Sequence, residues 1–288
     1  MNIGIGLPST IPGIPGRLIL QWASAAEQAG FSSLGTLDRV VYGNLETVPV
    51  LAAAAAVTER ITLTTAILIG PFRGNGALLA KQLATVDSIA AGRLRVGIAV
   101  GGRADDYEAT GEPFRERGRV FDAQLAEMRA VWEQQPRGHA GPIGPAPVQP
   151  GGPPLLIGGN AAATFRRMNE YGAGWISGAG GPAAFAAGAD RARRSWREAG
   201  RAGEPRLAAI AYVSLGDDAA GHARGYLGDY YSFTGDFAER IAARALTTPE
   251  QVAHTVAGFT EAGCDELILF PCHPDLAQVA LTAKAAGL

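Results

Sequence analysis

Short apolar stretches alternate with longer segments of helical spacing from one end of the chain to the other. Near-continuous apolar runs such as 67–69 are typical of strands that are buried on both faces, as a parallel sheet requires. Between the runs, apolar side chains recur at helical spacing, for example at Leu125, Met128 and Trp132. The pattern predicts eight strands, at residues 3–7, 33–37, 61–67, 94–100, 155–157, 174–176, 207–215 and 267–270.

Glycines and capping residues mark the ends of the predicted helices. Residues 248–251 combine an N-cap threonine, a proline at the first helical position and a capping-box glutamine, and Gly181 with Pro182 marks a similar start. Five helices end at a glycine just before the next strand, where glycine tolerates the left-handed backbone that closes a helix. These glycines are Gly30, Gly92, Gly172, Gly200 and Gly263.

Eight strand–helix units without a linker-like break predict an α/β fold, a single (β/α)8 TIM barrel domain spanning residues 1–288. An open, doubly wound sheet is the alternative. Two segments exceed a minimal barrel: a Pro/Gly-rich insertion at 136–153 before strand five, and a helical insertion at 217–247 after strand seven. Long insertions in a compact domain tend to be lids or binding loops. The second insertion carries an aromatic group, Tyr226, Tyr230, Tyr231, Phe233 and Phe237.

Charge and cysteine content exclude several classes of partner. A formal net charge of -2 over 288 residues lacks the electrostatic footprint of a nucleic-acid binder. Cys264 and Cys272 form no CxxC pair, which favours a reducing compartment. The first residues do not resemble a signal peptide, and no apolar stretch reaches the length of a membrane span. We therefore expect a cytoplasmic protein without membrane or nucleic-acid partners.

The active site of such a barrel lies on the loops that follow the strands. The loops 158–160 and 178–181 are glycine-rich and lead into helices, so two adjacent helix N-termini can form a phosphate cradle. Tight strand-to-helix turns also need glycine, and that is the alternative for either loop alone.

Charged residues follow strands two, three and four, and their side chains are expected to converge on one mouth. They are Asp38, Arg39 and Arg73, followed by Arg103, Asp105 and Asp106 in the loop after strand four, and the candidates for catalysis among them are Asp38, Arg39, Arg73 and Asp105. An ion-pair network that fixes the loops is the alternative role. Tyr107, in the same loop as Asp105, can either face the mouth or cap the following helix against the barrel.

Several kinds of catalysis lack the residues they need. Neither Lys81 nor Lys284 follows a strand, which disfavours Schiff-base chemistry. The four histidines show no metal-ligand spacing, so we expect no metal, and there is no GxSxG elbow. A phosphate cradle without nucleophile, metal site or reactive lysine indicates a cofactor that supplies its own chemistry.

Five segments resemble the bacterial luciferase-like monooxygenase superfamily. Each motif alone is weak, but together they cover almost the whole chain in the right order. The segments are TERITL (58–63), FRGNGALLAK (72–81), ATVD (84–87), GRLRVGIAVG (92–101) and PLLIGGN (154–160).

The resemblance implies that the barrel binds reduced FMN or coenzyme F420, a 5-deazaflavin. The ring is expected over a bulge in strand three, with a cis peptide bond between Ala66 and Ile67, and the phosphate at Gly158 and Gly159. By resemblance, Asp38 matches the aspartate that the deazaflavin enzymes place beside the cofactor, and Arg73 matches their strand-three loop. With Arg39 and Asp105 from the converging loops, they are the expected catalytic residues. The implied cofactor contacts are Asp38, Ala66, Ile67, Ile69, Asn75, Val100, Gly101, Gly158, Gly159, Asn160, Ala161 and Gly178. The expected substrate contacts are Phe72, Tyr107 and His273.

Two positions depart from the family pattern. The deazaflavin enzymes often carry a histidine after the aspartate, and this chain has Arg39 there. Some members have a glutamate after strand four, where this chain has Gly102, with Asp105 further on. These departures disfavour the sugar-phosphate dehydrogenase branch. Arg39 can still stabilise an anionic reduced flavin or a substrate oxyanion.

The resulting expectation is an oxidoreductase or monooxygenase that acts on a small organic substrate. A non-catalytic flavin-binding barrel is one alternative. A cofactor-free isomerase of a phosphorylated metabolite is another, and only His273 qualifies as its strand-end base. A separate reductase that supplies reduced cofactor, and assembly as a homodimer, are further expectations.

Overall fold

Eight parallel strands form a closed barrel in chain order in the computed structural model. It describes residues 1–235 and 237–288, and the side chain of Phe237 lies outside that description. Because β8 pairs with β1, the ring closes, which confirms the predicted barrel over the doubly wound sheet. The strands are β1 (Asn2–Gly6), β2 (Ser33–Thr36), β3 (Thr62–Ile69), β4 (Leu94–Ala99), β5 (Leu155–Gly158), β6 (Gly174–Ser177), β7 (Arg206–Val213) and β8 (Glu266–Pro271).

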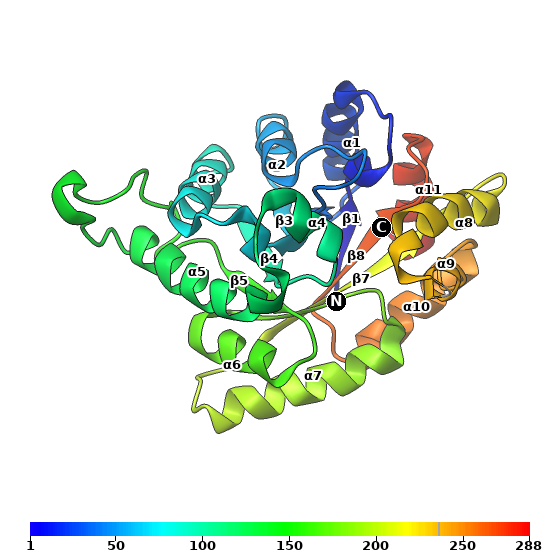
Figure 1. The fold of residues 1–288 in the computed structure, drawn as a ribbon. Coiled ribbons are helices and arrows are strands. Elements are labelled where there is room, and N and C mark those ends of the chain that lie inside the picture. Colours follow the sequence, from blue (N-terminus) through cyan, green and yellow to red (C-terminus); the bar gives the residue numbers. More distant parts are fainter. Residues whose placement is uncertain (236) are drawn as a thin grey trace.

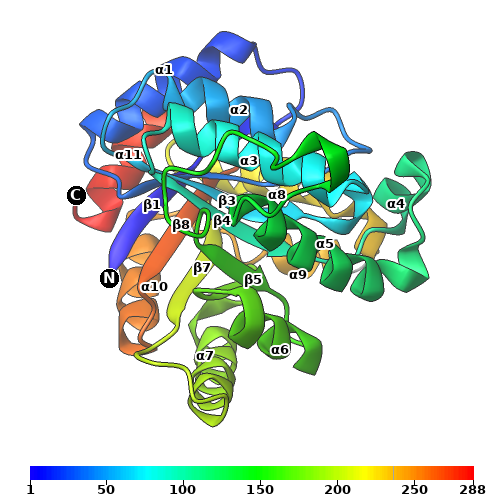
Figure 2. The same cartoon turned by 90° about the vertical axis from the view of Figure 1, so that its left-hand side faces the viewer.

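Helices surround the strands (Figure 1), and the short α4 lies at the opposite end of the molecule from the N-terminus (Figure 2). None of the described helices combines the length and apolar character needed to cross a membrane. The helices are α1 (Gly16–Gln28), α2 (Thr47–Ala55), α3 (Gly76–Ile89), α4 (Ala104–Thr110), α5 (Arg117–Trp132), α6 (Ala162–Tyr171), α7 (Gly181–Glu198), α8 (Ala219–Tyr230), α9 (Phe237–Ala242), α10 (Pro249–Glu261) and α11 (Ala277–Ala286).

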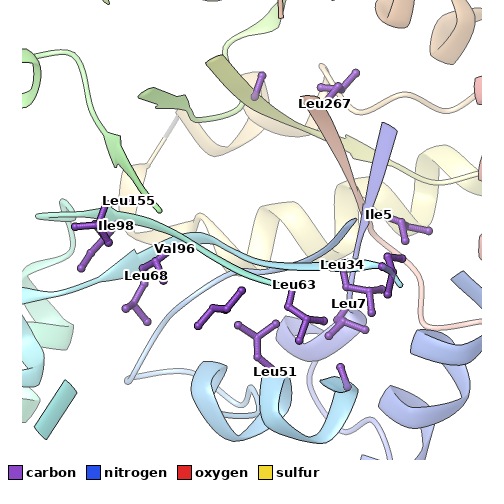
Figure 3. Packing of buried hydrophobic residues seen from close by; sticks show 14 of the residues in the cluster. Ile5, Leu7, Leu34, Leu51, Leu63, Leu68, Val96, Ile98, Leu155 and Leu267 are labelled. Atoms are coloured by element: carbon purple, nitrogen blue, oxygen red, sulfur yellow. The ribbon is translucent and has the colours of Figure 1, made fainter. Parts of the chain in front are cut away.

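Alternation along the strands builds two apolar layers. In β8, Leu267 and Leu269 pack in the cluster between barrel and helices, whereas Ile268 and Phe270 belong to the cluster inside the barrel. Figure 3 shows the outer layer, where Leu34 and Leu63 of the strands lie close to Leu51 of α2. Inside the barrel, a Cβ on Gly6 would lie only 2.2 Å from the Phe270 ring, so glycine is needed there.

A buried carboxylate lies at the N-terminal end of the barrel. Glu266, the first residue of β8, is 1% exposed and pairs with Arg95 and, at 2.9 Å, with Arg206. Burial opposes ionisation of Glu266, but the two guanidiniums outweigh this effect and hold the pKa of Glu266 below its ordinary value. This cluster lies at the end opposite the loops that follow the strands.

Most of the predicted helix boundaries are confirmed. Thr248 caps α10 by accepting a 3.3 Å hydrogen bond from the Gln251 N–H, although the Gln251 side chain accepts from Thr247 instead of completing a capping box with Thr248. The predicted left-handed glycine at Gly172 is wrong, because its φ is -93°, and a Cβ there would lie 2.9 Å from the Met168 carbonyl oxygen. The other four glycines have positive φ, namely Gly30, Gly92, Gly200 and Gly263.

Two long segments interrupt the regular alternation. Between α5 and β5 the chain contains the single-turn helix η4 (Gly138–Ala140) and projects away from the barrel beyond α3 (Figure 1). Between β7 and α10 it forms α8, the single-turn helix η5 (Ser232–Thr234) and α9. The first segment lies away from the mouth of the barrel, whereas the end of α8 forms part of the mouth.

Candidate active site

A pocket lies at the C-terminal mouth of the barrel. It is bordered by the ends of β2, β3, β4, β6 and β7 and by the end of α8. Parallel strands that end on one side bring their following loops together, as the sequence pattern predicted. The pocket is lined by Leu37, Asp38, Ala66, Ile67, Ile69, Phe72, Gly101, Gly102, Arg103, Asp106, Tyr107, Gly178, Ala179, Ile210, Tyr230 and Tyr231.

A bulge in β3 forms part of the pocket wall. The register between β3 and β4 shifts between Thr65 and Leu68, and the two residues of the bulge, Ala66 and Ile67, line the pocket. The peptide bond between them is cis, which confirms the prediction made from the family resemblance. The strand continues beyond the bulge to Ile69, two residues further than the sequence pattern predicted.

Asp38 and Arg73 form a buried ion pair beside the bulge. Arg73 Nη2 donates to Asp38 Oδ1 at 2.8 Å, and the Ile69 N–H donates to Oδ2 at 2.9 Å. The other end of the guanidinium pairs with Glu46 at 2.6 Å. Burial raises the pKa of Asp38, and Arg73 opposes that shift. Although burial alone would lower the pKa of Arg73, the carboxylates of Asp38 and Glu46 outweigh it and raise the value.

Arg39 belongs to a second ion-pair cluster, which joins the loops after β2 and β4. Its Nη2 lies 2.6 Å from Asp105 Oδ2, and its Nε lies 3.5 Å from Asp106 Oδ2. Asp106 also accepts hydrogen bonds from the backbone N–H groups of Val40 and Val41, at 2.9 and 2.7 Å. The four predicted catalytic residues thus fall into two pairs. Of these four residues, only Asp38 lines the pocket. In the loop after β4, Asp106 lines the pocket and its neighbour Asp105 does not.

Aromatic side chains form one wall of the pocket. Two of the three predicted substrate contacts, Phe72 and Tyr107, line it and meet edge to face with ring centroids 5.9 Å apart. The Tyr107 hydroxyl donates to the Val100 carbonyl at 2.5 Å, so this tyrosine also fixes the loop after β4. The third, His273, lies outside this pocket and stacks on His222 with centroids 4.0 Å apart.

The end of α8 brings Tyr230 and Tyr231 over the pocket, and Arg103 holds them there. The Arg103 guanidinium lies 4.5 Å from the centre of the Tyr230 ring and 3.9 Å from that of Phe233, and its Nη1 donates to the Tyr230 carbonyl at 2.9 Å. Sequence reasoning expected the loop with Arg103 and Asp106 at the mouth but selected Asp105 from it, and it did not assign Tyr230 or Tyr231 to the site. The aromatic group in the insertion was the available signal, but it does not indicate which rings face the mouth.

The glycine-rich loops divide between the pocket and the helix starts beside it. Gly101 and Gly178 line the pocket. Residues 158–161 lead into α6 and 178–180 into α7, and neither helix has a side-chain cap at its N-terminus. The uncapped backbone N–H groups at two helix starts on adjacent strands suit the phosphate of a flavin. The pocket beside them, with an apolar bulge and a carboxylate, suits its ring.

Two of the other predicted cofactor contacts, Asn75 and Gly159, make hydrogen bonds within the protein. Asn75 caps α3 through a 2.9 Å hydrogen bond from the Leu78 N–H to its side-chain oxygen. The Gly159 carbonyl accepts a 2.7 Å hydrogen bond from the Trp175 indole N–H. Across residues 1–235 and 237–288, no three His, Cys, Asp or Glu side chains are grouped so that they could hold a metal ion.

Solved structures share this fold over essentially the whole chain. An F420-dependent secondary alcohol dehydrogenase, solved with an F420-acetone adduct, matches 99% of this chain and 98% of its own with a TM-score of 0.80 and 20% identity. The monooxygenase RslO1 from Streptomyces bottropensis matches 100% of this chain and 97% of its own, with a TM-score of 0.79 and 22% identity. At these identities the likeness establishes the fold.

Sequence comparisons identify relatives, and the match to a family profile establishes the family. An uncharacterised protein of Mycobacterium tuberculosis is 31% identical over 209 residues, which cover 62% of this chain and 71% of that protein. An FMNH(2)-dependent dimethylsulfone monooxygenase of Pseudomonas putida is 31% identical over 157 residues, which cover 49% of this chain and 43% of that enzyme. The sequence profile of the luciferase-like monooxygenases matches residues 1–266. This chain therefore belongs to the luciferase-like monooxygenase family.

Proposed function

We propose that this protein is an oxidoreductase that holds a reduced flavin or deazaflavin in the pocket and acts there on a small organic substrate. One observation carries the proposal. The pocket combines the bulge at Ala66 and Ile67, the carboxylate of Asp38 and two glycine positions, Gly101 after β4 and Gly178 after β6. Family membership and the named dehydrogenase and monooxygenase relatives support the same conclusion.

Different residues of the chain would bind the ring and the phosphate of the cofactor. Ala66, Ile67 and Ile69 would support the ring, and the starts of α6 and α7 would hold the phosphate. The cofactor would supply the redox chemistry, and the protein would supply position, exclusion of water and polar contacts. Asp38 matches the aspartate of the deazaflavin enzymes by resemblance, which favours coenzyme F420 over FMN. A separate reductase and a homodimer remain part of this proposal.

Cofactor titration tests the proposal, and Gly178 offers a sharp variant for it. A Cβ built on Gly178 meets no atom within 4 Å, and its φ is not left-handed, so a larger side chain is accommodated but enters the pocket. Gly178→Leu should weaken binding of the preferred cofactor at least about tenfold while leaving the unfolding midpoint unchanged. Fluorescence titration with FMN and with coenzyme F420 measures this effect.

Gly225→Leu is the matched control for this titration. Gly225 lies on the exposed side of α8, also has open space around its Cβ and is not among the residues that line the pocket. This variant should bind cofactor as the wild type does. Failure of the wild type to bind either cofactor would contradict the proposal, as would undiminished binding by a folded Gly178→Leu variant.

A further inference from the structure

The buried tyrosine hydroxyls are paired within the protein, with one exception. Buried polar groups almost always find a hydrogen-bond partner, so a hydroxyl at a pocket wall that has none within the protein is free to bind a ligand or water. Among the described residues, Tyr230 is the one buried tyrosine whose hydroxyl makes no hydrogen bond within the protein. The hydrogen-bonded pairs are Tyr226 with Thr10, Tyr212 with Tyr231, Tyr42 with Asp229 and Tyr107 with Val100.

The ring of Tyr230 is held firmly in the pocket wall. The residue is 3% exposed and ends α8. Arg103 lies 4.5 Å from its ring centre, Arg39 lies 5.9 Å away, and the Tyr42 ring meets it edge to face at 5.3 Å. These contacts fix the ring from the loops after β2 and β4, so the hydroxyl is positioned before any ligand arrives.

The other polar side chains of the pocket have partners within the protein, including Arg103, whose Nη1 donates to the Tyr230 carbonyl. Asp38 is engaged by Arg73 and the Ile69 N–H, and Asp106 by Arg39 and two backbone N–H groups. The Tyr107 and Tyr231 hydroxyls are paired as described above. The rest of the lining is largely apolar, with Leu37, Ile67, Ile69, Phe72 and Ile210. Tyr230 therefore supplies an uncommitted hydroxyl in a mostly apolar space.

We propose that the Tyr230 hydroxyl recognises the substrate, which is a compact, mostly apolar molecule with one uncharged oxygen that accepts a hydrogen bond. The inference rests on the proposed function, because it places the substrate in the same pocket as the cofactor. Tyr230 would be a specificity-determining residue. A site built to donate to a substrate oxygen rejects an analogue without that oxygen, because its own polar group is then left unpaired.

The hydroxyl keeps its proton over the neutral pH range. Burial raises the pKa of Tyr230, against the opposing effect of the guanidiniums of Arg103 and Arg39. A protonated phenol donates a hydrogen bond to an oxygen acceptor, so ligand preference should not change with pH between about 6 and 9.

A pair of isosteric probes tests the proposal on two matched variants. Methylenecyclohexane has a CH2 group in place of the carbonyl oxygen of cyclohexanone. Saturation-transfer NMR titration gives the ratio of the affinities of the two probes. The wild type should prefer cyclohexanone about threefold to tenfold, as expected for one neutral hydrogen bond. Tyr230→Phe should abolish the preference without lowering the free energy of unfolding, since it breaks no hydrogen bond within the protein.

Tyr231→Phe is the matched control, because it removes a neighbouring hydroxyl whose partner is Tyr212. This variant should keep the preference and lose stability. An unchanged preference in Tyr230→Phe, or an equal loss in Tyr231→Phe, would overturn the assignment. The titration is run with and without oxidised cofactor. A missing cofactor complex then contradicts the proposed function, whereas an unchanged probe preference contradicts the role of Tyr230 alone.

Discussion

Arg73 Nη2 lies 2.8 Å from Oδ1 of the buried Asp38, and this contact ties the loop after β3 to the end of β2. Both carboxylate oxygens of Asp38 are engaged, because Thr47 Oγ1 also donates to Oδ1 at 3.1 Å and the Ile69 N–H donates to Oδ2. Asp38 therefore lines the pocket and fixes its walls at the same time. The two roles can be separated by experiment.

Asp38→Asn should lower the free energy of unfolding by about 3 kcal/mol, because it leaves a mostly buried guanidinium without its buried partner. Glu46→Gln removes the exposed partner of the same guanidinium and should cost less than about 1 kcal/mol. Denaturant unfolding measures both variants. Unchanged stability in Asp38→Asn, together with lost cofactor binding, would instead assign Asp38 to the cofactor alone.

Arg103→Lys should loosen the end of α8 while the barrel stays intact. A lysine cannot stack its head group flat on the rings of Tyr230 and Phe233, and it lacks the planar set of donors. Hydrogen exchange of the backbone N–H groups in 228–235 should therefore become faster. Arg224→Lys on the exposed side of α8 is the control and should leave exchange unchanged. Equal exchange in the wild type and Arg103→Lys would show that Arg103 does not hold this segment.

Glu266 should make stability depend on pH in the acidic range. Its pKa is lowered in the folded protein, so its stabilising effect is fully present above its ordinary pKa near 4.5 and is lost as the pH falls through the lower folded value. At neutral pH, Glu266→Gln should be less stable than the wild type by about 3 kcal/mol. That difference should shrink below pH 4.5 in unfolding curves measured from pH 7 to pH 3.

One outcome would contradict this account of Glu266. If the difference in unfolding free energy between wild type and Glu266→Gln stays constant from pH 7 to pH 3, the arginines do not lower the pKa of the Glu266 carboxylate. The control is Glu198→Gln, at the exposed end of α7, which should change neither stability nor its pH dependence measurably.

The strands were predictable because their apolar runs are long enough to be buried on both faces. The end of β3 was not predictable from the apolar pattern alone, because the bulge at Ala66 and Ile67 shifts the register against β4 and lets the strand continue to Ile69. The left-handed glycines were predictable from their place before a strand. Gly172 differs because its backbone packs closely against Met168, a contact that local sequence does not reveal.

The loops of the site were predictable, but the partners of their side chains were not. Helix α4 begins at Ala104, and its geometry turns Asp106 toward the barrel while Asp105 remains more exposed. Whether an arginine meets a carboxylate or a cofactor depends on how two loops approach each other. The place of Tyr230 in the pocket was harder to predict, because it depends on the path of the whole insertion after β7 and on the contacts of Tyr230 with Arg39 and Arg103.

The most direct test of the central claim is a crystal structure of the wild-type protein soaked with the cofactor that binds more tightly in titration. Electron density for the ring should lie against Ala66 and Ile67 and contact Gly101 and Gly178, with the phosphate at the starts of α6 and α7. Ring density at any other site on the protein, with this pocket filled only by water, would contradict the account.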